Sequence, residues 1–245
     1  MTTTTEQTCA DDVSHRNSAR RRLALLALAL ALLVSGCAPS PIPDTPRRGT
    51  KVPPGWSGKQ LQRYESGERL TEIEYRDGKE HGQWVSWYKS GAKEAVGAFR
   101  NGKKHGQWMA WYESGKPRMI GHYRDGVMHG PWVSFYENGQ KEMEGRFENG
   151  ADEGRWVRWY ANGNRRSEGV YHRGKRQGRW TYWHENGQKQ SEGMCIDDRE
   201  HGPWIEWHDN GRKQSEGEYR MGKRSGPWPE WDVEGKPEKA KPAEK

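Results

Sequence analysis

The sequence predicts an all-β fold, an elongated single-sheet array of antiparallel β-hairpins in repeats of 24 residues. A glycine returns every 24 residues, and a tryptophan stands two residues after each one. A second aromatic residue and a turn glycine follow at constant offsets. Such a fixed period is the signature of a repeat array whose units contact mainly their neighbours. The first glycines are Gly82, Gly106, Gly130, Gly154, Gly178, Gly202 and Gly226, and the tryptophans are Trp84, Trp108, Trp132, Trp156, Trp180, Trp204 and Trp228.

Composition favours a shallow aromatic core. Hydrophobic and charged residues each make up 31% of the chain, a balance typical of disorder. Fourteen tryptophans and ten tyrosines argue against disorder, because disordered segments contain few aromatic residues. The net charge is +7, with Lys and Arg interleaved with Glu throughout the repeats. We therefore expect a solvated surface and no nucleic-acid partner.

The N-terminal residues 1–36 have the features of an export signal. Arg20, Arg21 and Arg22 precede the apolar run from Leu23 to Val34, which is too short to span a bilayer. The following Val34-Ser35-Gly36-Cys37 resembles the bacterial lipobox. The resemblance implies that Cys37 is lipidated, becomes the mature N-terminus and anchors the protein to a membrane.

A proline-rich segment, 37–55, follows and should be an extended spacer. Ala38 directly after Cys37 is similar to lipoproteins that Gram-negative bacteria sort to the outer membrane. That similarity implies a lipid-anchored location in the cell envelope, facing the periplasm or the cell surface. Cys9 leaves with the signal, so Cys195 has no disulfide partner. It occupies an aromatic column, where we expect packing and not a reactive thiol.

The repeat array is predicted over 56–235, with an N-terminal cap at 56–81 and about seven repeats after it. The cap keeps the tyrosine and turn-glycine positions of a repeat but lacks the leading tryptophan. Residues 236–245 form a charged tail that we expect to be disordered.

Asn-Gly or similar pairs occur both between the two strands of a hairpin, as at Asn138-Gly139, and between successive hairpins, as at Asn101-Gly102. Such pairs favour two-residue type I′ turns. With this geometry Trp84 lies opposite Gly97, so each indole should cover bare backbone. Tyr88 and Phe99 then share the face of Trp84, whereas Val85 and Trp87 lie on the other. In the fifth full repeat Asp198 replaces a turn glycine, and we expect a distorted turn there.

The recurring pattern G-x-W-x-x-W-Y-x-N-G, followed by a Glu-Gly pair such as Glu144-Gly145, an aromatic residue and Asn-Gly-Lys, resembles the MORN-repeat variant. This variant occurs in bacterial proteins that include the YwqK-type antitoxins. The resemblance covers residues 58–235. It implies a β-hairpin array that serves as a binding scaffold, and antitoxin activity in part of the family.

Two polar groups were considered as sites of chemistry. His81, His105, His129 and His201 form a column, but equivalent residues of neighbouring repeats lie about 9.5 Å apart, too far to share a metal ion. The acids Asp197, Asp198 and Glu200 lack the spacing of a calcium loop. We therefore expect no metal, no cofactor and no enzymatic activity.

The second aromatic column is the candidate binding face, since it lies opposite the predicted core. It comprises Trp87, Trp111, Phe135, Trp159, Trp183 and Trp207. The sequence thus favours a lipid-anchored, non-enzymatic envelope scaffold that binds another protein. The alternatives are glycan or peptidoglycan binding through the tryptophan face, and an antitoxin-like inhibitor of a toxin.

Overall fold

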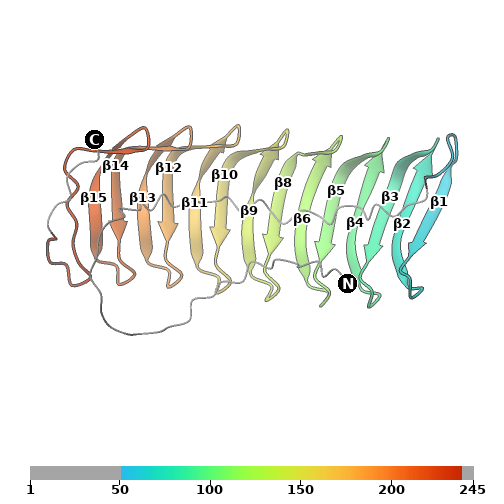
Figure 1. Cartoon of the computed structure of the whole chain (residues 1–245), viewed down its shortest axis with the longest axis horizontal. Coiled ribbons are helices and arrows are strands. Elements are labelled where there is room, and N and C mark those ends of the chain that lie inside the picture. Colours follow the sequence, from blue (N-terminus) through green and yellow to red (C-terminus); the bar gives the residue numbers. More distant parts are fainter. Residues whose placement is uncertain (1–50, 239–245) are drawn as a thin grey trace, which may run out of the picture. The chain divides into compact units, whose positions relative to one another are not determined.

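The computed structural model describes residues 51–238, which form one antiparallel sheet (Figure 1). Strands follow one another across the sheet in chain order, with the short β7 paired to β6 beside the main path. The predicted all-β, single-sheet hairpin array is confirmed. In the N-terminal half the strands are β1 (Gly58–Arg63), β2 (Arg69–Arg76), β3 (Lys79–Trp87), β4 (Lys93–Arg100), β5 (Lys103–Trp111), β6 (Pro117–Arg124), β7 (Val127–Met128) and β8 (Gly130–Phe135).

The C-terminal half of the sheet continues the same alternation. Its strands are β9 (Lys141–Glu148), β10 (Ala151–Trp159), β11 (Arg165–His172), β12 (Lys175–Trp183), β13 (Lys189–Ile196), β14 (Arg199–Trp207), β15 (Lys213–Arg220) and β16 (Lys223–Ser225). Among the described residues there is no helix long and apolar enough to cross a membrane. The predicted signal peptide 1–36, the lipidation site Cys37 and most of the spacer lie outside the described residues.

The two turns of each repeat differ, which corrects the prediction of type I′ geometry at both. At the second turn Asn101 and Gly102 both have positive φ, 52° and 78°, as type I′ requires. At the first turn only the glycine does: Gly91 has φ 87° and its N–H donates to the carbonyl of Tyr88. Next to this turn, the register of β3 against β4 shifts between Ser86 and Trp87. This is the longer hairpin loop in which a type I turn is followed by a left-handed glycine and a bulge.

The turn that carries Asp198 is not distorted, contrary to expectation. Asp197 and Asp198 adopt φ of 49° and 69°, close to the values at Asn101-Gly102. Arg176 supports the conformation, since its backbone N–H donates to the Asp198 carboxylate at 2.8 Å and its guanidinium donates to the Asp198 carbonyl at 2.6 Å. These contacts offset the strain of a left-handed non-glycine residue.

Tryptophan and glycine pair across each hairpin as predicted, with Trp84 opposite Gly97 and Trp108 opposite Gly121. The indole that covers a glycine, however, comes from the following hairpin. A Cβ added to Gly97 would overlap the ring of Trp108, and one added to Gly121 would overlap Trp132. Each tryptophan therefore seals the junction between two repeats. This placement explains why the second strand requires glycine at that position.

The core is a continuous aromatic column along one face of the sheet. Trp108, Trp132 and Trp156 are almost fully buried. Phe147 bridges two of them edge-on, with ring centroids 5.4 Å from Trp132 and 5.0 Å from Trp156. The predicted packing role of Cys195 is confirmed, because it is fully buried in this column and burial raises the pKa of its thiol to about 11.

The two ends of the array are held by further contacts, and the C-terminal end extends slightly beyond the predicted boundary at residue 235. At the N-terminus Trp56 packs against Tyr75, with ring centroids 5.7 Å apart, and its carbonyl accepts the N–H of Gly78. At the C-terminus Trp231 pairs with Pro237. The N–H of Glu238 also donates to a backbone carbonyl of the array. Residues 236–238 thus belong to the array and not to the predicted tail.

Candidate interaction surface

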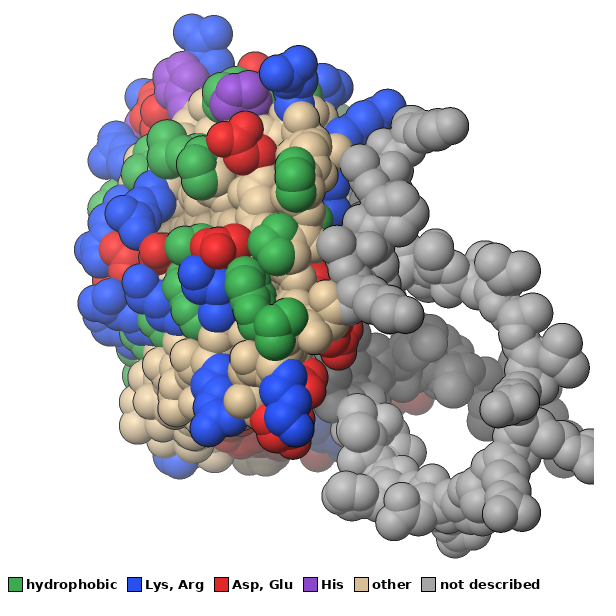
Figure 2. Space-filling view, turned by 90° about the vertical axis from the view of Figure 1, so that its left-hand side faces the viewer, with side chains coloured by type: hydrophobic (Ala, Val, Ile, Leu, Met, Phe, Trp, Pro, Cys, Tyr) green, Lys and Arg blue, Asp and Glu red, His purple; other side chains and the backbone are tan. Residues whose placement is uncertain are grey.

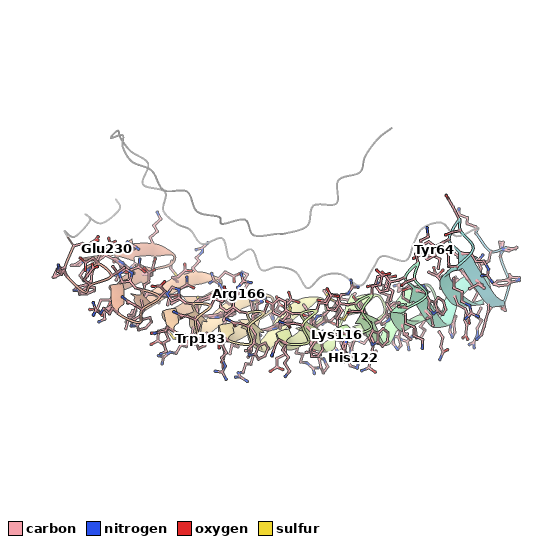
Figure 3. The ribbon with its side chains drawn as sticks, turned by 90° about the horizontal axis from the view of Figure 1, so that it is seen from below. Tyr64, Lys116, His122, Arg166, Trp183 and Glu230 are labelled. Atoms are coloured by element: carbon pink, nitrogen blue, oxygen red, sulfur yellow. The ribbon has the colours of Figure 1, made fainter. Side chains whose placement is uncertain are left out.

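The two faces of the sheet differ in their side chains. We call the face with the Trp84 column the inner face and the face with Val85 and Trp87 the outward face. Figure 3 places His122 and Trp183 on one side of the sheet and Tyr64, Arg166 and Glu230 on the other. Because the inner face holds the aromatic core, the outward face is the broad surface on which a partner could dock.

The predicted binding column lies on the outward face, and all six of its members are half-buried. They are Trp87, Trp111, Phe135, Trp159, Trp183 and Trp207. Their backbone is fixed from the inner face, where the Tyr88 hydroxyl donates to the carbonyl of Trp111 at 2.8 Å. The Tyr112 hydroxyl donates likewise to the Phe135 carbonyl at 2.7 Å. This hydrogen bond recurs at successive repeats and links each repeat to the next.

Basic side chains lie over most rings of this column. Lys141 Nζ is 5.6 Å from the centroid of Trp159, and Lys189 Nζ is 5.6 Å from that of Trp207. The guanidinium of Arg165 is 5.9 Å from that of Trp183. Within residues 51–238 there is no such cation over Trp111 or Phe135. The column is therefore divided into cation-covered and uncovered rings.

One row of side chains, here called the central row, crosses the outward face from strand to strand. Its members are direct cross-strand partners, so they share one face. The row consists of Leu61, Glu72, Val85, Val96, Met109, Ile120, Val133, Glu144, Val157, Glu168, Thr181, Glu192, Ile205 and Glu216. It has an apolar segment, Val85 to Val133 on β3–β8, and a charged segment, Glu144 to Glu216 on β9–β15.

In the charged segment each glutamate is held by basic neighbours. Glu168 accepts from Arg155 at 2.8 Å and lies 3.0 Å from Arg165. Glu192 accepts from Arg179 and Lys189, both at 2.8 Å. Burial opposes the charge on Glu192, but these two partners outweigh it and lower its pKa. Viewed from the C-terminal end, acidic and basic side chains are intermixed over the surface (Figure 2).

This charged network covers Val157, whereas Ile205, further along the charged segment, stays half-buried. Val157 lies between Glu144 and Glu168 and is only 2% exposed. Val133, between Ile120 and Glu144, remains half-buried. The same residue type in the same strand position is thus covered in one region of the sheet and open in the other.

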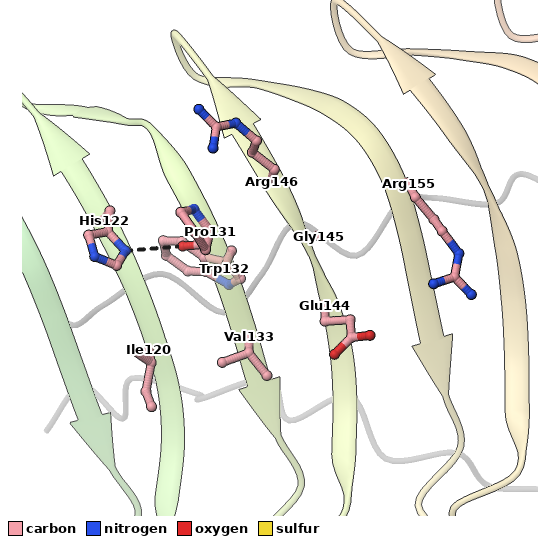
Figure 4. A pocket seen from close by; sticks show the side chains of 9 residues that line it. All are labelled: Ile120, His122, Pro131, Trp132, Val133, Glu144, Gly145, Arg146 and Arg155. Carbon is pink, nitrogen blue, oxygen red and sulfur yellow. Dashed lines mark hydrogen bonds between the residues drawn. The ribbon is translucent and has the colours of Figure 1, made fainter.

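A shallow hollow marks the border between the two segments (Figure 4). Ile120 and Val133 line one side, and Glu144 and Arg155 line the other. A second hollow lies further along, between Arg155, Arg179 and Trp183. Both are open depressions of the outward face.

The two polar groups weighed from the sequence have structural contacts. In the histidine column, His105 Nδ1 lies 3.6 Å from Asp125 and His129 Nδ1 lies 3.5 Å from Glu148. Within residues 51–238, no cluster of three or more His, Cys, Asp or Glu residues could hold a metal ion. Among the acids, Asp197 accepts from Gln177 at 2.7 Å.

Two features of this surface escaped the sequence reasoning. The first is the tyrosine hydrogen bond between repeats, and the second is an asparagine ladder in the first turns. Asn162 donates to the carbonyl of Glu185 at 2.7 Å, and Asn210 donates to that of Val233 at 2.8 Å. Tyr and Asn each recur at a constant position of the repeat in the sequence. Their hydrogen-bond acceptors, however, are carbonyls of the next repeat, which become apparent only when the hairpins are stacked.

These observations define an open, single-sheet β-hairpin array with a core on one face and an exposed second face. Five of its segments match the MORN repeat variant family, at residues 104–125, 128–149, 152–173, 176–194 and 200–221. The predicted resemblance to that variant is confirmed for these repeats. No curated protein matches the chain.

Proposed function

We propose that this protein is a non-enzymatic scaffold of the bacterial cell envelope, anchored by lipid at Cys37, whose outward face binds another protein. The lipobox at Val34–Cys37 supports the anchor. The observation that carries the binding function is the recurrence of one pattern, a basic side chain over a column ring, at Trp159, Trp183, Trp207 and Trp231 on the outward face. Repeat arrays commonly use such extended surfaces for binding.

The cation-covered rings favour a protein partner over a glycan. A sugar stacks on a free aromatic face, whereas Lys141, Arg165 and Lys189 already lie over Trp159, Trp183 and Trp207. The same Lys and Arg residues contact the glutamates of the central row. A partner with complementary carboxylates and apolar side chains would suit this mixed surface.

Photo-crosslinking in the intact envelope tests the proposal. A benzophenone amino acid at Thr181, in the charged segment, should give an adduct with one defined protein. The matched control is Lys175, an exposed residue next to the second turn on the same strand β12, which should give none. Adducts with peptidoglycan instead of protein would favour the glycan alternative, and equal labelling from both sites would contradict the proposal.

The anchor is tested separately with Cys37→Ser. The variant should accumulate as unprocessed precursor and incorporate no labelled palmitate. Palmitate incorporation in that variant would overturn the lipid-anchor assignment.

A further inference from the structure

The apolar segment of the central row arises from coordinated changes at three columns. Where other repeats have glutamate, β4 and β6 have Val96 and Ile120. The arginine column that binds those glutamates, occupied by Arg155 and Arg179 further along, holds glutamine at the corresponding positions of β3 and β5. The third column, Lys141 beside Glu144, becomes Pro117 beside Ile120. Most of the charge is thus removed together with its partners, and Lys93 beside Val96 is the one basic residue of these columns that remains on β3–β6.

Loss of charge also removes the cover. In the charged segment, the long salt-bridged side chains leave Val157 only 2% exposed. The five residues of the apolar segment are all half-buried instead. Among residues 51–238, Trp111 and Phe135 lack the cation that covers other rings of their column, whereas Arg69 lies 5.7 Å from the centroid of Trp87 on β3. A contiguous apolar patch of this kind marks an interaction site on a soluble surface.

The size of the patch suits a pair of sheets. Five strands at about 4.8 Å spacing span about 24 Å, and six residues along each strand span about 20 Å. The outward face of these strands, including polar residues such as Gln83 and Gln107 beside the apolar row, then covers about 480 Å² on each molecule, and a pair would bury about 1,000 Å² in total. That area reaches the lower limit of specific protein–protein interfaces.

We propose that the outward face of β3–β8 packs against the same face of a second copy of this chain. A second copy has the same strand spacing, so its side-chain rows interdigitate with this row along its whole length, as the side chains of the two facing sheets do in a β-sandwich. The segment is also nearly symmetric about Met109, with Val85 and Val96 on one side and Ile120 and Val133 on the other. An isologous contact needs that self-complementarity. The charged segment stays free for the partner protein, so the two proposals can fail separately.

The test substitutes Val96→Glu and Ile120→Glu together. Glutamate already occupies this row position in five other strands, including β9 and β11, so the fold should tolerate it. At position 96 the new carboxylate would also have Lys93 three residues before it, as Glu144 has Lys141. We expect the full-length wild type in mild detergent to sediment as a dimer. The double variant should be monomeric, with its dissociation constant raised at least about 100-fold, because pairing would bury two charged groups and the carboxylate at position 120, which has Pro117 in place of a lysine, would be unpaired.

The matched control changes the charged segment in the opposite sense, with Glu168→Val. It should leave the dimer intact. Far-UV circular dichroism of the Val96→Glu/Ile120→Glu variant, and its melting at concentrations below dimerisation, should equal those of the wild type. A wild type that stays monomeric at a concentration about 100-fold above a micromolar dissociation constant would overturn the proposal. So would a dimer that survives the double substitution.

A crosslink at the centre of the row gives independent evidence. Met109→Cys should be linked to Met109→Cys of a second copy by a short bismaleimide, which bonds one thiol at each end. Thr181→Cys, in the same row on β12, should not be linked under the same conditions. The fully buried Cys195 is common to both variants. Equal linking of both variants, or none at Met109→Cys, would contradict pairing through the apolar segment.

Discussion

The outward face of β3–β8 and that of β9–β15 share one backbone and one register, yet they cover their central row differently. In the second region glutamates bridged to Lys and Arg alternate along the row, and Val157 is buried between two of them. In the first region the row is aliphatic and stays half-open. The difference shows that strand order alone does not determine the surface chemistry of a repeat array, since changes at three columns of residues convert a salt-bridged face into an apolar one.

Exposed apolar residues also occur in the second region. Val170 is 43% exposed and Met194 is 44% exposed. Each lies directly opposite an arginine, Arg155 or Arg179, so neither forms part of a continuous apolar row. Single exposed residues of this kind are normal on a protein surface. The distinction between the regions therefore rests on contiguity.

The largest expected effect concerns the inner face, where the two regions should not differ. Trp132→Ala should lower the free energy of unfolding by about 3–5 kcal/mol, because the indole is buried over Gly121 and against Phe147. Trp180→Ala, its counterpart in the second region, should cost about the same, and Trp228→Ala near the C-terminal end should cost less. Chemical denaturation followed by circular dichroism measures all three. Unequal losses at Trp132 and Trp180 would show that the regions differ in their core as well.

Much of this core was predictable from the sequence, because the period of 24 residues fixes which residues recur on one face. The pairing of Trp84 with Gly97 followed from the turn positions. The overlap of each indole with the preceding hairpin did not, since it occurs at a register shift between hairpins, as between Val96 and Ala98 where β4 meets β5. The sequence indicated an Asn-Gly turn there, but Asn162 instead uses its side chain to bond the next repeat.

The candidate surface was predictable in outline only. The Trp87 column could be assigned to the outward face by alternation along the strand, but its coverage depends on residues 18 positions earlier in the chain, such as Lys141 over Trp159. Similarly, the central row joins residues of separate hairpins, and its continuity appears only in the register. Alternation along one strand predicts on which face a residue lies, whereas the side chains that cover it come from other strands and depend on the register between them.

The second prediction separates binding from stability. Trp159→Ser should weaken partner binding by about 2 kcal/mol, roughly thirtyfold, if this ring is buried in the interface. The melting temperature should change little, since the half-buried side chain contributes less packing than the inner column. Trp111→Ser, in the first region, should leave partner binding unchanged and weaken self-association. Binding by calorimetry and mass by sedimentation distinguish the two. If Trp111→Ser weakened partner binding and Trp159→Ser weakened self-association, the proposed division of the outward face would be wrong.

The third prediction compares the valines of the central row directly. Val157→Ala should cost about 1.5 kcal/mol, the value for removing two buried carbon groups, because Val157 is almost fully buried. Val133→Ala should cost about half of that in the monomer, since Val133 is only half-buried. Urea denaturation at concentrations below dimerisation measures both. Equal costs would show that the charged network does not cover the row.

The smallest effect concerns the hydrogen bonds that join the repeats. Burial raises the pKa of the Tyr112 hydroxyl above its ordinary value near 10, so the folded state retains a proton that the unfolded state loses. This contribution to stability is fully present below pH 10 and is lost as pH rises above it. Tyr112→Phe should cost about 1 kcal/mol at pH 7, because it removes the bond to the Phe135 carbonyl.

The Tyr112→Phe variant should also lose less stability than the wild type between pH 9 and 11. In the second region His184 makes the corresponding bond to the carbonyl of Trp207 at 2.8 Å and has no hydroxyl to ionise. His184→Phe should therefore cost a similar amount at pH 7 and leave the alkaline slope unchanged. Urea denaturation at each pH gives the slopes. If the free energy of unfolding falls equally with pH in the wild type and both variants, ionisation of Tyr112 does not cause the alkaline sensitivity. The hydrogen bonds of Tyr112 and His184 would then respond alike to alkaline pH.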